Sequence, residues 1–107
     1  MREADPSMTD DEPVRVWVDG EAVKIEGELD ADCVELLDTV LGQLQEDASR
    51  PLIVDMEDVT FMDSRGMSCL IKASLRQPEQ HIVLRQTTPS VLRVLQISGA
   101  DHLFIFE

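Results

Sequence analysis

The sequence has few aromatic residues, with three Phe, one Trp and no Tyr among 107 residues. It therefore offers little of the aromatic surface on which nucleic-acid bases or sugars stack. Basic residues are also scarce, with 9 Lys and Arg against 22 Asp and Glu, for a net charge of −13. Because phosphate backbones and anionic membranes are bound by Lys and Arg, this charge argues against a nucleic acid or a membrane as partner. The negative charge favours binding to a basic surface on another protein, although a need for solubility alone would explain this charge equally well.

Long apolar runs and metal-binding patterns are missing as well. No run approaches the roughly 20 residues of a membrane span, and the acidic residues 1–13 do not resemble a signal peptide. We therefore expect a cytoplasmic protein. Cys33 and Cys69 form no Cys-x-x-Cys motif, and no Cys/His cluster has metal-ligand spacing. We expect buried free thiols, with a redox pair as the alternative, and no cofactor.

An apolar fraction of 43% is enough for one packed core in a chain of this length. Residues 1–13 contain two prolines and five acids, which predicts a disordered tail before a domain at 14–107. The predicted strands are 14–18, 22–28, 52–55, 82–84 and 103–106, and the predicted helices are 30–44, 63–77 and 88–99. This order predicts an α/β domain with a mixed sheet of about five strands covered by three or four helices.

Turn and cap residues mark several of these boundaries. Asp19-Gly20 predicts a tight hairpin turn between the first two strands. Asp30 is expected to cap the first helix. Thr88 and Pro89 predict the start of the third helix, with Thr88 as its cap, and Gly99 predicts its end.

Burial can also be predicted from the pattern. The short apolar run at 52–54 suits a central strand covered on both faces. Phe61 and its neighbours Val59 and Met62 are expected to continue the core. On the second helix, the spacing of apolar residues places Leu75 on the buried side.

The segment Asp63-Ser64-Arg65-Gly66, at the predicted start of the second helix, is the clearest functional signal. A hydroxyl at this position lies near backbone amides that have no partner within the helix, which is favourable for a phosphate. Gly66 has no Cβ, so a loop or another chain could approach closely. On these residues alone, however, simple capping of the helix explains the pattern as well.

Three motifs in order carry a resemblance to a known family. They are Gly27-Glu28-Leu29-Asp30; Leu52-Ile53-Val54-Asp55 followed by Val59-Thr60-Phe61-Met62-Asp63-Ser64-x-Gly66; and Pro89-Ser90-Val91-x-Arg93-Val94-Leu95-x-Ile97-Ser98-Gly99. Together they resemble the bacterial anti-sigma factor antagonists of the STAS domain family, from about Val14 to Phe106. The resemblance implies that an anti-sigma factor, itself a serine kinase, phosphorylates Ser64. The unphosphorylated form would bind that anti-sigma factor and so release a sigma factor, and a phosphatase would restore it.

The resemblance implies that Asp30 and Asp63 border the same surface as Ser64. We expect the partner to be bound by Asp30, Asp63, Ser64, Arg65 and Gly66, on a protein that binds and does not catalyse, with a monomer as the default oligomeric state. Arg65 departs from the family pattern, in which Ser or Thr is common. Its guanidinium would pair with phosphoserine or with an acidic partner, or would simply be solvated.

Two other interpretations compete with this one. STAS domains also serve as cytoplasmic subunits of transporters or as signalling scaffolds, and some are never phosphorylated. The enzyme-like alternative is a phospho-accepting pocket of Asp55, Asp58 and Asp63, but a matching lysine on a later strand is missing. His81 and His102 have no partner for acid–base or metal chemistry that the sequence reveals.

Overall fold

Five strands form one sheet in the order β1-β2-β3-β4-β5, in a computed structural model that describes residues 14–107. The segment 1–13, predicted to be a disordered tail, lies outside the described residues. β1 is antiparallel to β2, and β2 to β5 are parallel. The elements are β1 (Val14–Asp19), β2 (Ala22–Leu29), the 3₁₀ helix η1 (Ala31–Cys33), α2 (Val34–Leu44), β3 (Leu52–Met62), α3 (Ser64–Arg76), β4 (Ile82–Arg85), α4 (Pro89–Ser98), the 3₁₀ helix η2 (Asp101–Leu103) and β5 (Ile105–Phe106). The predicted α/β architecture with a mixed sheet is confirmed.

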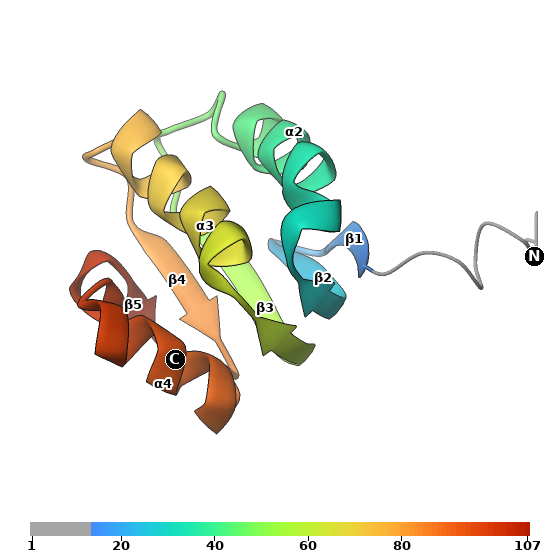
Figure 1. Cartoon of the computed structure of the whole chain (residues 1–107). Helices are drawn as coiled ribbons and strands as arrows, with labels where there is room; N and C mark the ends of the chain where they lie inside the picture. The colour runs from blue at the N-terminus through green and yellow to red at the C-terminus, as the bar shows by residue number, and fades with distance from the viewer. Residues whose placement is uncertain (1–13) are drawn as a thin grey trace, which may run out of the picture.

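The three α-helices cover the same face of the sheet (Figure 1). From β2 onward, each strand leads through a helix to the next parallel strand in one direction, and right-handed crossovers of this kind place their helices on one side. The expectation that 52–54 is covered on both faces was therefore wrong. Val54 is fully buried beneath the helices, whereas Ile53 and Asp55, which alternate with it, point to the opposite face.

The core lies between the sheet and the helices and consists of aliphatic side chains. Its largest fully buried hydrophobic members are Ile25, Leu29, Leu37, Leu41, Met56, Leu70, Ile82, Leu84 and Leu95. Burying one such side chain contributes about 1.5–3 kcal/mol. The core therefore holds α2, α3 and α4 in fixed positions over the strands that lead to them.

β3 extends to Met62, well beyond the predicted end near Asp55. Its pairing with β2 shifts register twice, and such bulges change which side chains point inward. Phe61, predicted to lie in the core, is 48% exposed, while Met62 is buried, because neighbouring strand residues point to opposite faces. Leu75 was also expected to be buried, but it is 67% exposed on the outer side of α3.

The predicted turn and caps are mostly confirmed. Gly20 adopts a left-handed conformation, with φ of +68°, in the turn where Asp19 pairs with Ala22. Asp30 caps η1, where its side chain accepts a hydrogen bond from the backbone N–H of Asp32 at 3.0 Å. Thr88 lies at the cap position of α4, but its hydroxyl makes no cap hydrogen bond.

Two glutamines form a buried polar contact between the α2–β3 and α3–β4 connections. Gln45 donates through Nε2 to Oε1 of Gln80 at 2.9 Å and to the carbonyl of Ala73 at 2.8 Å. Gln80 donates through its own Nε2 to the carbonyl of Arg50 at 2.8 Å. The pair thus joins the two connections through buried hydrogen bonds to each other and to the backbone.

Candidate functional site

The loops that follow β2 and β3 meet at one edge of the sheet because the two strands are parallel. Leu29 and Met62 are paired at the strand ends, so Asp30 and Asp63 begin their loops side by side. The backbone N–H of Asp63 donates to the carbonyl of Leu29 at 3.0 Å. The structure thus brings together the acidic residues of two separate sequence motifs.

Asp63 caps the N-terminus of α3. Its Oδ1 accepts hydrogen bonds from the backbone N–H groups of Arg65, at 2.8 Å, and Gly66, at 3.1 Å. These donors are therefore already occupied. This changes the expectation that the Ser64 hydroxyl lies near several unpartnered amides, because a phosphate there would have to displace the Asp63 carboxylate to use them.

Ser64 is the first residue of α3, and it is exposed. Among residues 14–107 its hydroxyl makes no hydrogen bond, although its carbonyl accepts one from Ser68 Oγ at 2.8 Å. Arg65 beside it is also exposed and forms no ion pair within the described part of the chain. The Ser64 hydroxyl can therefore be reached by another protein without any rearrangement of its neighbours.

Gly66 is buried where α3 presses against the end of β2. A Cβ at this position would lie against the backbone of Leu29, only 2.6 Å from its carbonyl carbon. No side chain fits at that separation, so only glycine allows this approach. The sequence left open whether a loop or another chain approaches Gly66. The structure shows that the close neighbour is the end of β2 in the same chain.

The charges around Ser64 are mostly negative. The neighbouring segments 28–35 and 63–66 carry the acids Glu28, Asp30, Asp32, Glu35 and Asp63 and the single base Arg65. A phosphate would add about −1.5 to −2 charges to this surface at neutral pH. The edge is thus suited to a basic partner surface before such a modification and strongly acidic after it.

Two exposed apolar side chains lie within a few residues of the site loops. Leu36, in the first turn of α2, is 39% exposed, and Phe61, close before Asp63 on β3, is 48% exposed. Exposed apolar side chains next to charged loops are typical of protein contacts. The sequence did contain a signal for Phe61, since neighbouring strand residues such as Phe61 and Met62 point to opposite faces.

The acids of the enzyme-like alternative do not form a pocket. Asp55 pairs with Lys24 at 3.3 Å on the face of the sheet that lacks helices. Asp63 instead caps α3 at the sheet edge. Among residues 14–107, no three His, Cys, Asp or Glu side chains are grouped so that they could hold a metal ion. In the same part of the chain, no helix is long and apolar enough to cross a membrane.

The two cysteines lie directly beneath the site. Cys33 and Cys69 are free and fully buried, as predicted. Cys33 Sγ donates to the carbonyl of Asp30 at 3.1 Å, and Cys69 Sγ lies 3.6 Å from the carbonyl of Arg65. Burial raises the pKa of both thiols, and the pKa of Cys69 reaches about 12. Because the thiolate is the reactive form, both are poor nucleophiles at neutral pH.

We expect these thiols to make stability fall at alkaline pH. The pKa of Cys69 is raised from its ordinary value of 9.0 to about 12, so the unfolded state loses this proton first as the pH rises. The free energy of unfolding should therefore be highest below pH 9.0 and fall between pH 9.0 and about 12. Urea unfolding measured across that range tests this.

The matched variant for that experiment is Cys33→Ala combined with Cys69→Ala. It should be less stable at neutral pH, because atoms are removed from the core, but its stability should decline less between pH 9.0 and about 12. The chain has no Tyr and only two Lys, Lys24 and Lys72, so few other groups titrate in this range. Equal slopes for both proteins would contradict the role of the thiols.

Comparison with known proteins agrees with this arrangement. The sequence profile described as "Mlab, STAS domain" matches residues 15–106. The anti-sigma-B factor antagonist of Staphylococcus aureus is 30% identical over 83 residues, which are 76% of this chain and 77% of that protein. A STAS domain protein from Planctomyces limnophilus has a similar structure, with a TM-score of 0.70 and 23% identity over 88% of this chain and 87% of that one. The Bacillus cell fate determinant SpoIIAA in its phosphorylated form gives a TM-score of 0.60 and 24% identity, covering 88% and 90%.

The profile match spans nearly all of the described residues, and the S. aureus relative aligns with most of the chain. The fold as a whole is similar to that of the structural neighbours, since the matched portions cover most of both proteins. The chain therefore belongs to the STAS domain family.

Proposed function

We propose that this protein is an anti-sigma factor antagonist whose binding is switched off by phosphorylation of Ser64. In its unphosphorylated form it binds an anti-sigma factor that is also a serine kinase, and a sigma factor is thereby released. A phosphoserine phosphatase restores the binding form. Because sigma factors act in the cytoplasm, we place the protein there, as a binding module without catalysis of its own.

The observation that carries this proposal is the state of Ser64 in the structure. Its hydroxyl is exposed and free, at the start of a helix whose first amides are already bound by Asp63. A phosphate on Ser64 would therefore remain an exposed charge beside Asp63, because the backbone amides at the helix start are not free to neutralise it. Such a charge opposes any partner surface that fits a neutral hydroxyl. The switch then needs no change of fold.

The remaining candidate residues have distinct parts in the proposal. Asp30, Asp63 and Arg65 border the Ser64 hydroxyl and contact the partner, with Leu36 and Phe61 as neighbouring apolar contacts. Gly66 is buried against Leu29 and sets the position of the helix start. Its contribution to binding is therefore indirect.

Two comparisons support the proposal. The S. aureus relative, aligned over most of both chains, is an anti-sigma-B factor antagonist. SpoIIAA, which shares the fold, has been solved in unphosphorylated and in phosphorylated form. A protein of this fold thus accepts a phosphate, and we infer that Ser64 is the acceptor here.

Phosphate transfer in vitro tests the proposal. The protein is incubated with ATP, Mg²⁺ and each anti-sigma kinase of the source cell in turn, and the product is examined by intact mass and site mapping. We expect one phosphate on Ser64 from one of these kinases, because this hydroxyl is free and exposed. The kinase that transfers it is also the binding partner.

Two serine variants serve as controls for this experiment. Ser64→Ala should accept no phosphate, whereas Ser68→Ala, which changes another exposed serine one turn along α3, should be modified like the natural chain. Transfer to Ser68 or to no residue would overturn the switch. The second outcome would favour a STAS module that is not phosphorylated, such as a transporter subunit or a signalling scaffold.

A further inference from the structure

The face of the sheet opposite the helices is not covered by any element of residues 14–107 (Figure 1). On this face, the strand registers place side chains from adjacent strands in rows that run across the sheet. One row is apolar and consists of Ala22, Ile53, Val83 and Ile105, which are paired successively from β2 to β5. Ile105, at the edge, is 44% exposed, Ile53 is half-buried, and Ala22 and Val83 are only 5% and 7% exposed.

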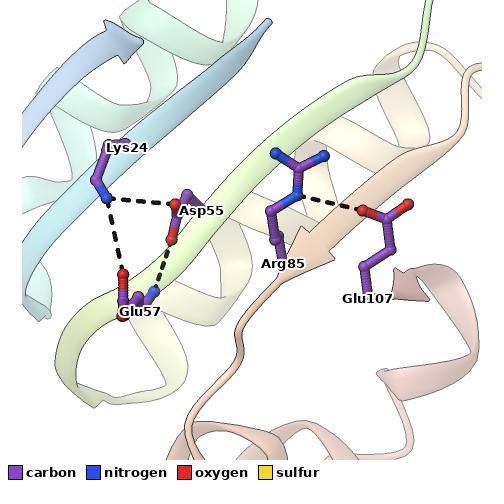
Figure 2. Close-up of polar contacts among 5 residues, drawn as sticks. All are labelled: Lys24, Asp55, Glu57, Arg85 and Glu107. Carbon is purple, nitrogen blue, oxygen red and sulfur yellow. Dashed lines mark hydrogen bonds and ion pairs between the residues drawn. The ribbon is translucent and has the colours of Figure 1, made fainter. Parts of the chain in front are cut away.

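A second row on the same face is charged, and its signs alternate. Lys24 lies beside Asp55, Asp55 beside Arg85, and Arg85 beside Glu107 (Figure 2). Lys24 Nζ is 3.3 Å from Asp55 Oδ2, and Arg85 Nε is 3.2 Å from Glu107 Oε1. From β2 to the chain end after β5, the row therefore reads plus, minus, plus, minus.

Other charges border the row. Glu57 lies 4.0 Å from Lys24, and Glu21 lies 3.7 Å from Arg85. The hydrogen bond between Lys24 and Asp55 raises the pKa of the lysine, so it stays charged at neutral pH. With only 9 bases against 22 acids in the chain, a row that matches each acid with a base is unusual for this surface.

An alternating row of four charges is complementary to itself when it is reversed. A two-fold axis parallel to the strands, between β3 and β4, would place Lys24 of one copy opposite Glu107 of the other. The same axis would place Asp55 opposite Arg85, and it would pack the apolar row onto its own equivalent. Symmetric dimers need such a self-complementary patch, and two sheets pack face to face at about 10 Å.

We propose that two copies of this chain associate through the open faces of their sheets, which we call the open-face dimer. This differs from the monomer expected from the sequence, and it does not depend on phosphorylation. α3 lies on the other face of the sheet, so Ser64 would stay accessible in both copies (Figure 1). The dimer would thus present two partner sites at once.

Sedimentation equilibrium of the full chain at concentrations up to about 1 mM is the first test. A dimer whose Kd lies above about 1 mM would be too weak to count as a specific contact. We expect a species of twice 12.0 kDa. Lys24→Glu should weaken the dimer more than about tenfold, because it places two pairs of like charges in contact. Glu107→Lys should weaken it similarly, for the same reason.

The chain offers a matched control and a rescue. Lys72→Glu makes the same charge change at the other lysine, which is paired with Asp38 at 2.9 Å on the helix side, and it should leave the dimer unchanged. Mixing Lys24→Glu with Glu107→Lys restores every opposite-charge pair, so the mixture should form a heterodimer. A misfolded variant could not produce this rescue.

Three results would overturn the open-face dimer. The first is a full chain that remains monomeric at about 1 mM. The second is an equal loss of association in Lys24→Glu and Lys72→Glu, which would place the contact elsewhere or attribute it to net charge. The third is a mixture of the two complementary variants that stays monomeric.

Discussion

Ser64→Glu should bind the anti-sigma kinase at least about 100-fold more weakly than the natural chain, whereas Ser64→Ala should bind about as tightly. The glutamate places a negative charge beside Asp63, where both nearby helix amides are already occupied. A partner surface that fits a hydroxyl would have to bury this charge unpaired, at several kcal/mol, and each 1.4 kcal/mol corresponds to about tenfold. Titration calorimetry with the kinase identified by phosphate transfer measures both constants.

The effect should depend on position and not on total charge. Ser49→Glu makes the same change in the exposed loop between α2 and β3, which precedes β3 and so lies at the other end of the strands from Ser64. It should change affinity less than about threefold, as expected for a charge outside the contact. Equal weakening by Ser49→Glu and Ser64→Glu would refute a local switch. Tight binding by Ser64→Glu would remove the electrostatic basis of the proposal altogether.

The parts of the fold that local chemistry determines could be predicted from the sequence. The Asp19-Gly20 turn and the left-handed end of α4 at Gly99 depend on one or two residues, and both are found where expected. The order of strands and helices follows from alternation and helical spacing in the same way. The Asp63-Ser64 start of α3 was predictable because an N-cap is also a local feature.

Features that depend on distant pairing could not be predicted in this way. The length of β3 follows from its irregular pairing with β2, which no local pattern encodes. The buried contact between Gln45 and Gln80 joins residues far apart in sequence. At the site, the sequence showed a serine near helix amides, but only the structure shows that Asp63 already binds two of them. That difference decides whether a phosphate is neutralised or left exposed.

Gly66→Ala should be the most destabilising small substitution at the site. The added Cβ would lie 2.6 Å from the carbonyl carbon of Leu29, and backbone atoms cannot rotate away as a side chain can. α3 and the end of β2 would have to separate, and overpacking of this kind costs about 3 kcal/mol. For a domain of this size, that corresponds to a fall in Tm of roughly 10–20 °C. Thermal unfolding followed by circular dichroism measures it.

Gly42→Ala is the matched control, since Gly42 is also a helical glycine, on α2. Its added Cβ would meet only the guanidinium of the Arg76 side chain, at an ordinary contact distance of 3.6 Å. Alanine favours the helix over glycine by about 1 kcal/mol, so Gly42→Ala should raise Tm while Gly66→Ala lowers it. If Gly66→Ala is as stable as Gly42→Ala, α3 does not press on Leu29 as described. If it is destabilised and also binds the kinase weakly at a temperature where it is still folded, the contact with Leu29 positions Ser64 for its partner.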